Sequence, residues 1–197
     1  TADLDLDLQA AQPTASLALS TGAIDLGALL RGLGVADDLD GHVQALRFNV
    51  QGRGSSLSEW ALHSTFDLRV TGGSLAVRGA ARSTITEMSV AEARIGALAG
   101  EPVRARLEGG VDQTPVTIDV TSGTLAELAA DAGHVPFALA ARAAGTQLAL
   151  DGEVSLPLGS GGQLSFEMRG ERLDSLSTLA RVELPPWGPW SFSSPIH

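Results

Sequence analysis

The sequence predicts a mainly β protein, an elongated, twisted antiparallel sheet in the form of an open trough or a curled half-barrel with a few short helices. Apolar and polar residues alternate along many short segments, such as 46–51 and 66–70. Successive side chains of a strand point to opposite faces, so each segment has one apolar and one polar face. Short loops rich in glycine or proline separate the segments, which favours pairing between neighbours in sequence, as in a meander.

The alternation predicts twelve strands, at 3–9, 15–20, 43–51, 65–71, 74–79, 83–90, 102–108, 115–121, 136–142, 146–154, 163–169 and 189–193. We expect Gly72-Gly73, Gly109-Gly110, Gly145 and segment 157–162 to form turns or loops between them. We treat residues 1–197 as a single β-rich region. Because the chain opens inside an expected strand and lacks an initiator methionine, we expect it to be a fragment of a longer protein.

Four segments break the alternation with helical spacing. Asp25 precedes leucines at i, i+3, i+4 and i+7 spacing and can cap that helix. Ser56 stands three residues before Glu59, and Thr124 three residues before Glu127, which is the spacing of a capping box. A similar pattern follows Asp174. The sequence therefore predicts short helices near 25–33, 56–62, 124–131 and 174–180.

The charge of the chain excludes one class of partner. All 13 basic residues are arginine, and the formal net charge is −10. A chain of this sign repels phosphate backbones, so we predict no binding to nucleic acid. Cysteine is absent, which rules out disulfides without assigning a compartment. No stretch approaches the roughly 20 apolar residues that a membrane-spanning helix needs.

The chain has no recognisable catalytic or metal-binding motif. The four histidines, at 42, 63, 134 and 197, have no metal-ligand spacing, and we expect each on a loop or a solvent-facing position. Asp3, Asp5 and Asp7 resemble the start of a calcium loop, but Leu8 stands where that loop needs glycine. The acidic segment 37–40, followed by Gly41, is expected to be a polar loop. We predict no catalytic residues, no metal and no cofactor.

Two tryptophans close the chain in an unusual setting. Trp187 and Trp190 lie in the proline- and glycine-rich segment 185–190. They can form a stacking site for a ligand, but a rigid turn whose rings fold over a sheet end is the more ordinary interpretation.

The order of these segments resembles the C-terminal region of the AsmA family. The resemblance rests on LGALLRGLG at 26–34, LDG at 39–41, FNVQGRGSSL at 48–57 and FDLRVTGGSL at 66–75. Further along it continues with GTLAEL at 123–128, GTQLALDG at 145–152 and LPPWGPWSF at 184–192. It covers most of the chain, and the order and spacing of the motifs carry it.

The resemblance implies a non-enzymatic periplasmic module of a protein anchored in the inner membrane of a Gram-negative bacterium, through a segment not present in this chain. AsmA proteins and their TamB-related relatives are similar to bridge-like lipid-transfer proteins, in which an apolar trough shields phospholipid or other acyl-chain lipid and so maintains the outer membrane. Two alternatives stay open: an assembly factor for outer-membrane β-proteins, and a structural periplasmic spacer with a self-covered apolar face.

The residues that we expect to face lipid share the apolar phase of four predicted strands. They are Leu46, Phe48, Val50, Phe66, Leu68, Val70, Val116, Ile118, Val120, Leu164, Phe166 and Met168. An ordinary core position in a closed sandwich is the alternative for each of them.

Overall fold

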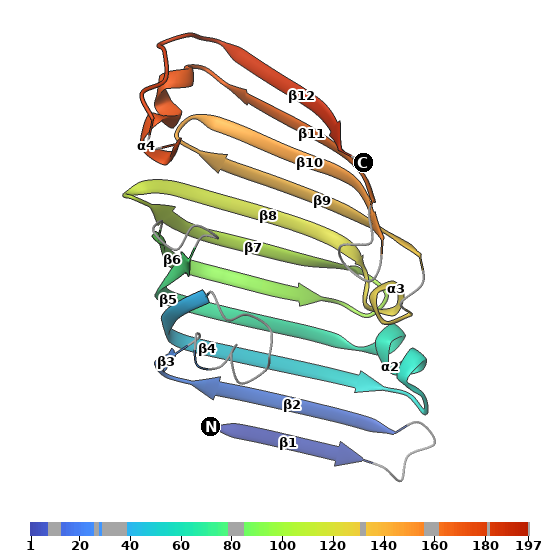
Figure 1. Cartoon of the computed structure of the whole chain (residues 1–197). Helices are drawn as coiled ribbons and strands as arrows, with labels where there is room; N and C mark the ends of the chain where they lie inside the picture. Colours follow the sequence, from blue (N-terminus) through green and yellow to red (C-terminus); the bar gives the residue numbers. More distant parts are fainter. Residues whose placement is uncertain are drawn as a thin grey trace.

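The computed structural model describes residues 1–7, 13–25, 28, 39–78, 85–130, 133–155, 162–180 and 182–196. The described strands form one antiparallel sheet (Figure 1). They are β1 Ala2–Asp7, β2 Thr14–Thr21, β3 Ile24–Asp25, β4 Leu39–Arg53, β5 Thr65–Arg78, β6 Ile85–Ala97, β7 Pro102–Val111, β8 Thr114–Thr124, β9 His134–Ala143, β10 Thr146–Ser155, β11 Gly162–Gly170 and β12 Trp190–Ile196.

The sheet is an open meander of twelve strands. Its order is β1-β2-β4-β5-β6-β7-β8-β9-β10-β11-β12, and the two-residue strand β3 pairs with β4 beside this path. Almost every strand therefore pairs with its neighbours in sequence, which confirms the predicted fold class and the meander. The prediction for 83–90 stopped too early, because β6 continues to Ala97. Residues 8, 9, 79, 83 and 84 of the predicted strands lie outside the described part.

The prediction of a turn at Gly72-Gly73 is wrong. Segments 65–71 and 74–79 were predicted as two strands, but β5 runs through both glycines. Gly72 has φ 63° and Gly73 φ 156°, backbone conformations that other residues rarely adopt. A Cβ atom on Gly73 would lie only 2.3 Å from the His42 carbonyl oxygen on β4. These glycines bend a continuous strand against its neighbour.

The predicted turn at Gly109-Gly110 is also wrong, because both residues lie in β7. The chain reverses at Asp112 and Gln113, whose φ angles are 47° and 68°. Two successive positive φ angles are typical of a tight type I′ hairpin turn. By contrast, Gly145 does form a turn, between β9 and β10, as predicted. Residues 157–161 of the predicted loop lie outside the described part.

The longest strands share an irregularity at one level of the sheet. On β7, the neighbouring same-face positions Leu107 and Gly109 are two residues apart, as in a regular strand. The residues that pair with them in turn on the next three strands are three residues apart. These are Ala93 and Val90 on β6, Val70 and Gly73 on β5, and Leu46 and Val43 on β4. Three adjacent strands therefore each carry one extra residue at the same level, and the register between β6 and β7 shifts there, between Val90 and Glu92.

Short helices lie at the two ends of the strands. They are α2 Leu57–His63, α3 Leu125–Ala129, the 3₁₀ helix η1 Leu173–Leu176 and α4 Ser177–Ala180. These confirm the helices predicted near 56–62, 124–131 and 174–180, although the last one starts as a 3₁₀ turn. In Figure 1, α2 and α3 lie at one end of the strands, where they contact each other, and α4 lies at the opposite end. No helix in the described ranges has the length and apolar character needed to cross a membrane.

The predicted capping residues act as expected, with one variation. Thr124 and Glu127 form a complete capping box: the Glu127 N–H donates to Thr124 Oγ1 (3.2 Å), and the Thr124 N–H donates to the Glu127 carboxylate (2.7 Å). At α2, the Glu59 N–H donates to Ser56 Oγ (3.2 Å), but the Glu59 carboxylate accepts from the N–H and hydroxyl of Ser55. The hydrogen bond from the Ser55 N–H is the main reason that the pKa of Glu59 is lowered, and the hydrogen bond from the Ser55 hydroxyl is the second.

The predicted helix 25–33 falls mainly outside the described residues. Asp25, however, is described, and its carboxylate accepts a hydrogen bond from the N–H of Ala28 at 2.8 Å. This contact is the capping interaction predicted for Asp25.

Candidate functional site

The strand register builds one continuous apolar face. Partners in an antiparallel pair lie on the same face, so the pairings can be followed from strand to strand. One line of partners, called here the central row, crosses the whole sheet and consists of Ala2, Leu19, Phe48, Leu68, Ile95, Ala105, Val120, Leu139, Leu150, Phe166 and Ser194.

Three further rows flank the central row on the same face. The second row contains Thr21, Leu46, Val70, Ala93, Leu107, Ile118, Ala141, Leu148, Met168 and Phe192. On the other side, the third row contains Leu4, Leu17, Val50, Phe66 and Ala97 on β1 to β6, and Phe137, Gly152, Leu164 and Ile196 on β9 to β12. The fourth row, beyond the second, contains Val43, Gly73, Val90, Gly109, Val116, Ala143, Thr146, Gly170 and Trp190. None of the four rows includes a charged residue.

All twelve residues predicted to face lipid lie on this apolar face. Phe48, Leu68, Val120 and Phe166 are in the central row, Leu46, Val70, Ile118 and Met168 in the second, Val50, Phe66 and Leu164 in the third, and Val116 in the fourth. The period-two alternation thus placed residues from four separate strands on one surface.

The apolar face has no second layer over it among the described elements, which form a single sheet with helices at the strand ends. Of the twelve residues, only Leu46 is buried, at 8% exposure, and the others are partly exposed. Ile95 is 38% exposed although it lies in the middle of the sheet, between Leu68 and Ala105. The exposure is therefore a property of the face and not only of its edge strands.

Few apolar side chains of the described part are buried. They are Val43, Leu46, Val90, Ala97 and Val135. A sheet of this width normally buries one face against a second layer of structure. The apolar face described here is consequently a large surface of the kind that marks a binding site.

Helix α2 packs against one end of the apolar face. A Cβ atom on Gly52 would lie 2.5 Å from the six-membered ring of Trp60, so the indole occupies the space above that glycine. Trp60 Nε1 also donates a hydrogen bond to the Gly54 carbonyl oxygen at 2.8 Å. The sequence did not indicate a role for Trp60, since its partners depend on where α2 lies on the sheet.

The opposite face of the sheet carries the charges. Arg47, Arg69, Arg94 and Arg106 are successive partners on β4 to β7, and Asp119 follows on β8. Like charges directly opposite each other destabilise a sheet unless other groups compensate them. This arginine row could not be predicted from the sequence, because the four residues are irregularly spaced along the chain.

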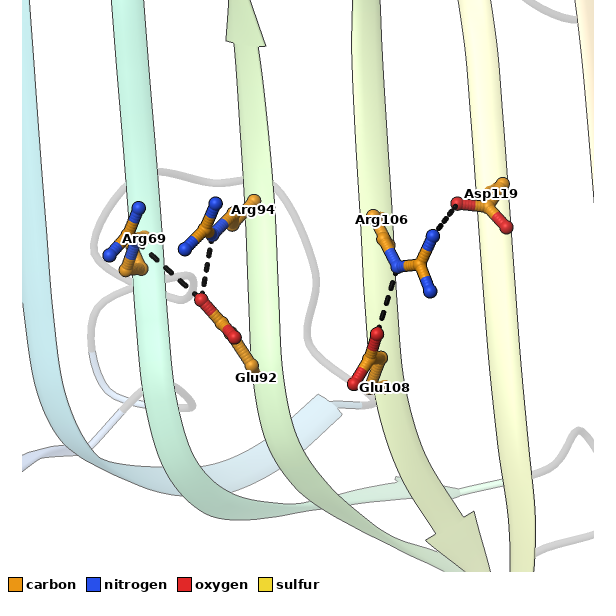
Figure 2. A network of polar contacts seen from close by, with 6 residues as sticks. All are labelled: Arg69, Glu92, Arg94, Arg106, Glu108 and Asp119. Carbon is orange, nitrogen blue, oxygen red and sulfur yellow. Dashed lines mark hydrogen bonds and ion pairs between the residues drawn. The ribbon is translucent and has the colours of Figure 1, made fainter.

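Two groups of ion pairs compensate Arg69, Arg94 and Arg106, as Figure 2 shows. Glu92 lies 2.7 Å from Arg94 Nε and 3.6 Å from Arg69 Nε. In the second group, Arg106 contacts Glu108 at 2.9 Å and Asp119 at 3.4 Å. The hydrogen bond to Glu108 is the main reason that the pKa of Arg106 is raised. These pairs are exposed, so each contributes little to stability. Their charges make this face of the sheet hydrophilic.

The two tryptophans near the C-terminus differ in their surroundings. Trp190 lies over β11, since a Cβ atom on Gly170 would be 2.9 Å from its indole. Trp187 is 69% exposed. The interpretation of rings folded over a sheet end therefore fits Trp190 and not Trp187.

The histidines lie apart from one another. His42 is exposed on β4 with its Nδ1 3.2 Å from Ser74 Oγ, and His134 is exposed at the start of β9. His63 was expected on a loop or solvent-facing position, but it is the partly exposed last residue of α2, and its Nδ1 lies 2.9 Å from the Glu59 carbonyl oxygen. His197 lies outside the described residues. Within the described ranges, no three His, Asp or Glu side chains come together as a metal site.

The acidic residues that the structure describes do not form a shared site. Asp3 and Asp5 lie on β1, on the face opposite to Leu4. Asp40 and Gly41 were expected in a loop, but both belong to β4 and pair with β5. Asp37 and Asp38 are not among the described residues.

Comparisons with known proteins do not assign a family. A scan against protein-family models found no match, and neither did searches of curated proteins and of solved structures. The resemblance to the AsmA family stays a prediction.

Proposed function

We propose that the chain binds the acyl chains of lipids on its apolar face and acts as a non-enzymatic lipid-transport module of the AsmA kind. In this proposal it works in the periplasm, as part of a protein attached to the inner membrane, and helps to maintain the outer membrane. One observation carries the proposal: an uncharged apolar face extends across eleven consecutive strands in a single layer.

The dimensions of the face suit a lipid path. Neighbouring strands are about 4.8 Å apart, so eleven strands span roughly 50 Å across the sheet. Each methylene group removed from water contributes about 0.8 kcal/mol. An acyl chain that moves along a row, from strand to strand, meets no charged side chain, whereas its headgroup can stay in water at the open side of the face.

The spacer alternative requires that other structure cover the apolar face. The exposure of Ile95 near the middle of the sheet favours a ligand-binding face over a self-covered one. The assembly-factor alternative depends on strand pairing at the sheet edges, where β1 and β12 each pair with one described strand. Every open sheet has two such edges, so they do not single out this role. We therefore develop only the lipid proposal.

Native mass spectrometry of the purified chain tests the proposal, with the chain mixed with phosphatidylcholine vesicles and re-isolated. We expect phospholipid bound to the wild type. Ile118→Glu, on the apolar face between Leu107 and Ala141, should lose the lipid, and Thr117→Glu on the opposite face should keep it. A wild-type chain that stays folded and carries no lipid in this experiment would contradict the proposal.

A further inference from the structure

Two buried polar atoms on the apolar face lack a hydrogen-bond partner. They are Thr146 Oγ1 and Trp190 Nε1. Thr146 is only 6% exposed. Buried polar groups are nearly always paired, because an unpaired one costs folding free energy. Two such atoms at one place therefore call for a physical explanation.

Both atoms lie close to the same backbone position, Gly170. Thr146, Gly170 and Trp190 are successive partners in the fourth row. A Cβ atom on Gly170 would lie 3.0 Å from Thr146 Oγ1 and 2.9 Å from Trp190 Nε1. Because residue 170 is glycine, both polar atoms can lie close to its backbone, and the side chain of any other residue would fill that space.

The chemistry of the pair selects a hydrogen-bond acceptor. An indole N–H can only donate, and a threonine hydroxyl can donate as well as accept. The adjacent part of the face is the second row, where Leu148, Met168 and Phe192 are partners and no charge is present. An acceptor with a full negative charge would lose its hydration there, so a neutral carbonyl oxygen is the better match.

An open pocket of about 450 Å³ lies at the same end of these strands, largely on the opposite face of the sheet. Gly170 and Trp190 contribute to its walls, but Gln147, Arg169 and Ser191, which also line it, are successive partners that alternate with the residues of the apolar face. The Thr146–Trp190 pair therefore lies where the apolar face ends, at the end of the strands that carries α4, and polar groups begin beyond that end.

We propose that Thr146 and Trp190 form a subsite for the ester carbonyl of an acyl lipid. This inference rests on the proposed function and specifies one end of its ligand. The indole of Trp190 turns away from Gly170 when lipid enters, the carbonyl oxygen accepts from the indole N–H and the Thr146 hydroxyl, and the acyl chain lies along the second and central rows. The headgroup lies in water at the end of the strands that carries α4.

Calorimetric titration with two lipids that differ only in the carbonyl groups tests the subsite. The probes are monomeric dihexanoylphosphatidylcholine and its ether analogue, in which alkyl chains of equal length replace the acyl chains. We expect the wild type to bind the ester about two- to tenfold more tightly than the ether, the range that one net hydrogen bond contributes.

Two variants locate the preference. Thr146→Val keeps the shape of the side chain without the hydroxyl, and Trp190→Phe removes the indole N–H. Each should bring the ratio of ester affinity to ether affinity closer to one, and this ratio is the readout, whatever the change in affinity for either lipid alone. Thr114→Val, a matched control at the start of β8 and away from Gly170, should keep the wild-type preference.

The outcomes separate the subsite from the proposed function. Equal affinity of the wild type for ester and ether overturns the subsite and leaves lipid binding by the apolar face intact. The same holds if the ester preference survives in both folded variants. Failure of the wild type to bind either lipid overturns both proposals.

Discussion

Replacement of Phe48 by glutamate distinguishes an open apolar face from a closed core. Phe48 lies in the central row between Leu19 and Leu68, and it is partly exposed. In an open face, the new carboxylate can stay in contact with water. In a closed core, the same carboxylate would be buried without a partner, which is among the few mechanisms that destabilise a domain by more than about 4 kcal/mol.

The expected loss of stability follows from the burial of Phe48. Complete burial of a phenylalanine side chain contributes about 1.5–3 kcal/mol. Because Phe48 is only partly buried, its removal should cost roughly half of that, and the hydrated carboxylate adds little. We expect Phe48→Glu to lower the free energy of unfolding by about 0.8–1.5 kcal/mol and to abolish lipid binding.

Urea denaturation followed by circular dichroism measures the first effect, and lipid retention measures the second. Gln51→Glu is the matched control, since it adds the same charge on the opposite, exposed side of the same strand, between the uncharged partners Ser16 and Thr65. It should leave both stability and lipid binding close to those of the wild type. Complete unfolding of Phe48→Glu without denaturant, or undiminished lipid binding by a folded variant, would refute the reasoning.

Three further predictions concern packing, pH and histidine. Gly109→Ala should lower the free energy of unfolding by about 2 kcal/mol or more in a urea titration, because its Cβ would lie 2.0 Å from the Ser89 carbonyl oxygen, whereas Gly22→Ala, with open space around its Cβ, should cost at most about 1 kcal/mol. The Glu59 carboxylate has a lowered pKa, so its contribution to stability is present above its ordinary pKa near 4.5 and is lost as the pH falls through the lower folded-state value. As the pH is lowered, the urea midpoint should therefore decline less in Glu59→Gln than in the wild type. An equal decline in both proteins would contradict this role of Glu59. Replacement of His42, His63 and His134 together by glutamine should leave lipid binding unchanged in the vesicle assay. A folded triple variant that no longer binds lipid would show that at least one of these histidines takes part in binding.

The part of the fold that local sequence determines was predictable. Alternation within a strand, as in Phe66 to Val70, fixes which side chains share a face, and it does so without knowledge of neighbouring strands. The capping contacts of Ser56 and Thr124 are equally local, since each involves residues within four positions. These features account for the correct fold class, the three described helices and the shared face of the twelve apolar residues.

The wrong predictions concern residues whose role depends on contacts with a neighbouring strand. Gly109 looks like a turn residue in isolation, but its lack of a side chain accommodates a carbonyl group of β6. Asp112 and Gln113 adopt the positive φ angles of the actual turn although neither is glycine. The arginine row and the Thr146–Trp190 pair depend on strand register, which a single sequence does not disclose.

The pairing of each strand with its sequence neighbours has a consequence for the length of the sheet. Since the meander has no long crossover along its main path, one additional hairpin would extend the sheet by about 10 Å without altering any existing pair. Chains of this design can therefore vary in span by gain or loss of hairpins. Their stability accumulates from nearest-neighbour contacts, as in repeat proteins, so unfolding can begin at a terminal hairpin while the middle of the sheet stays paired.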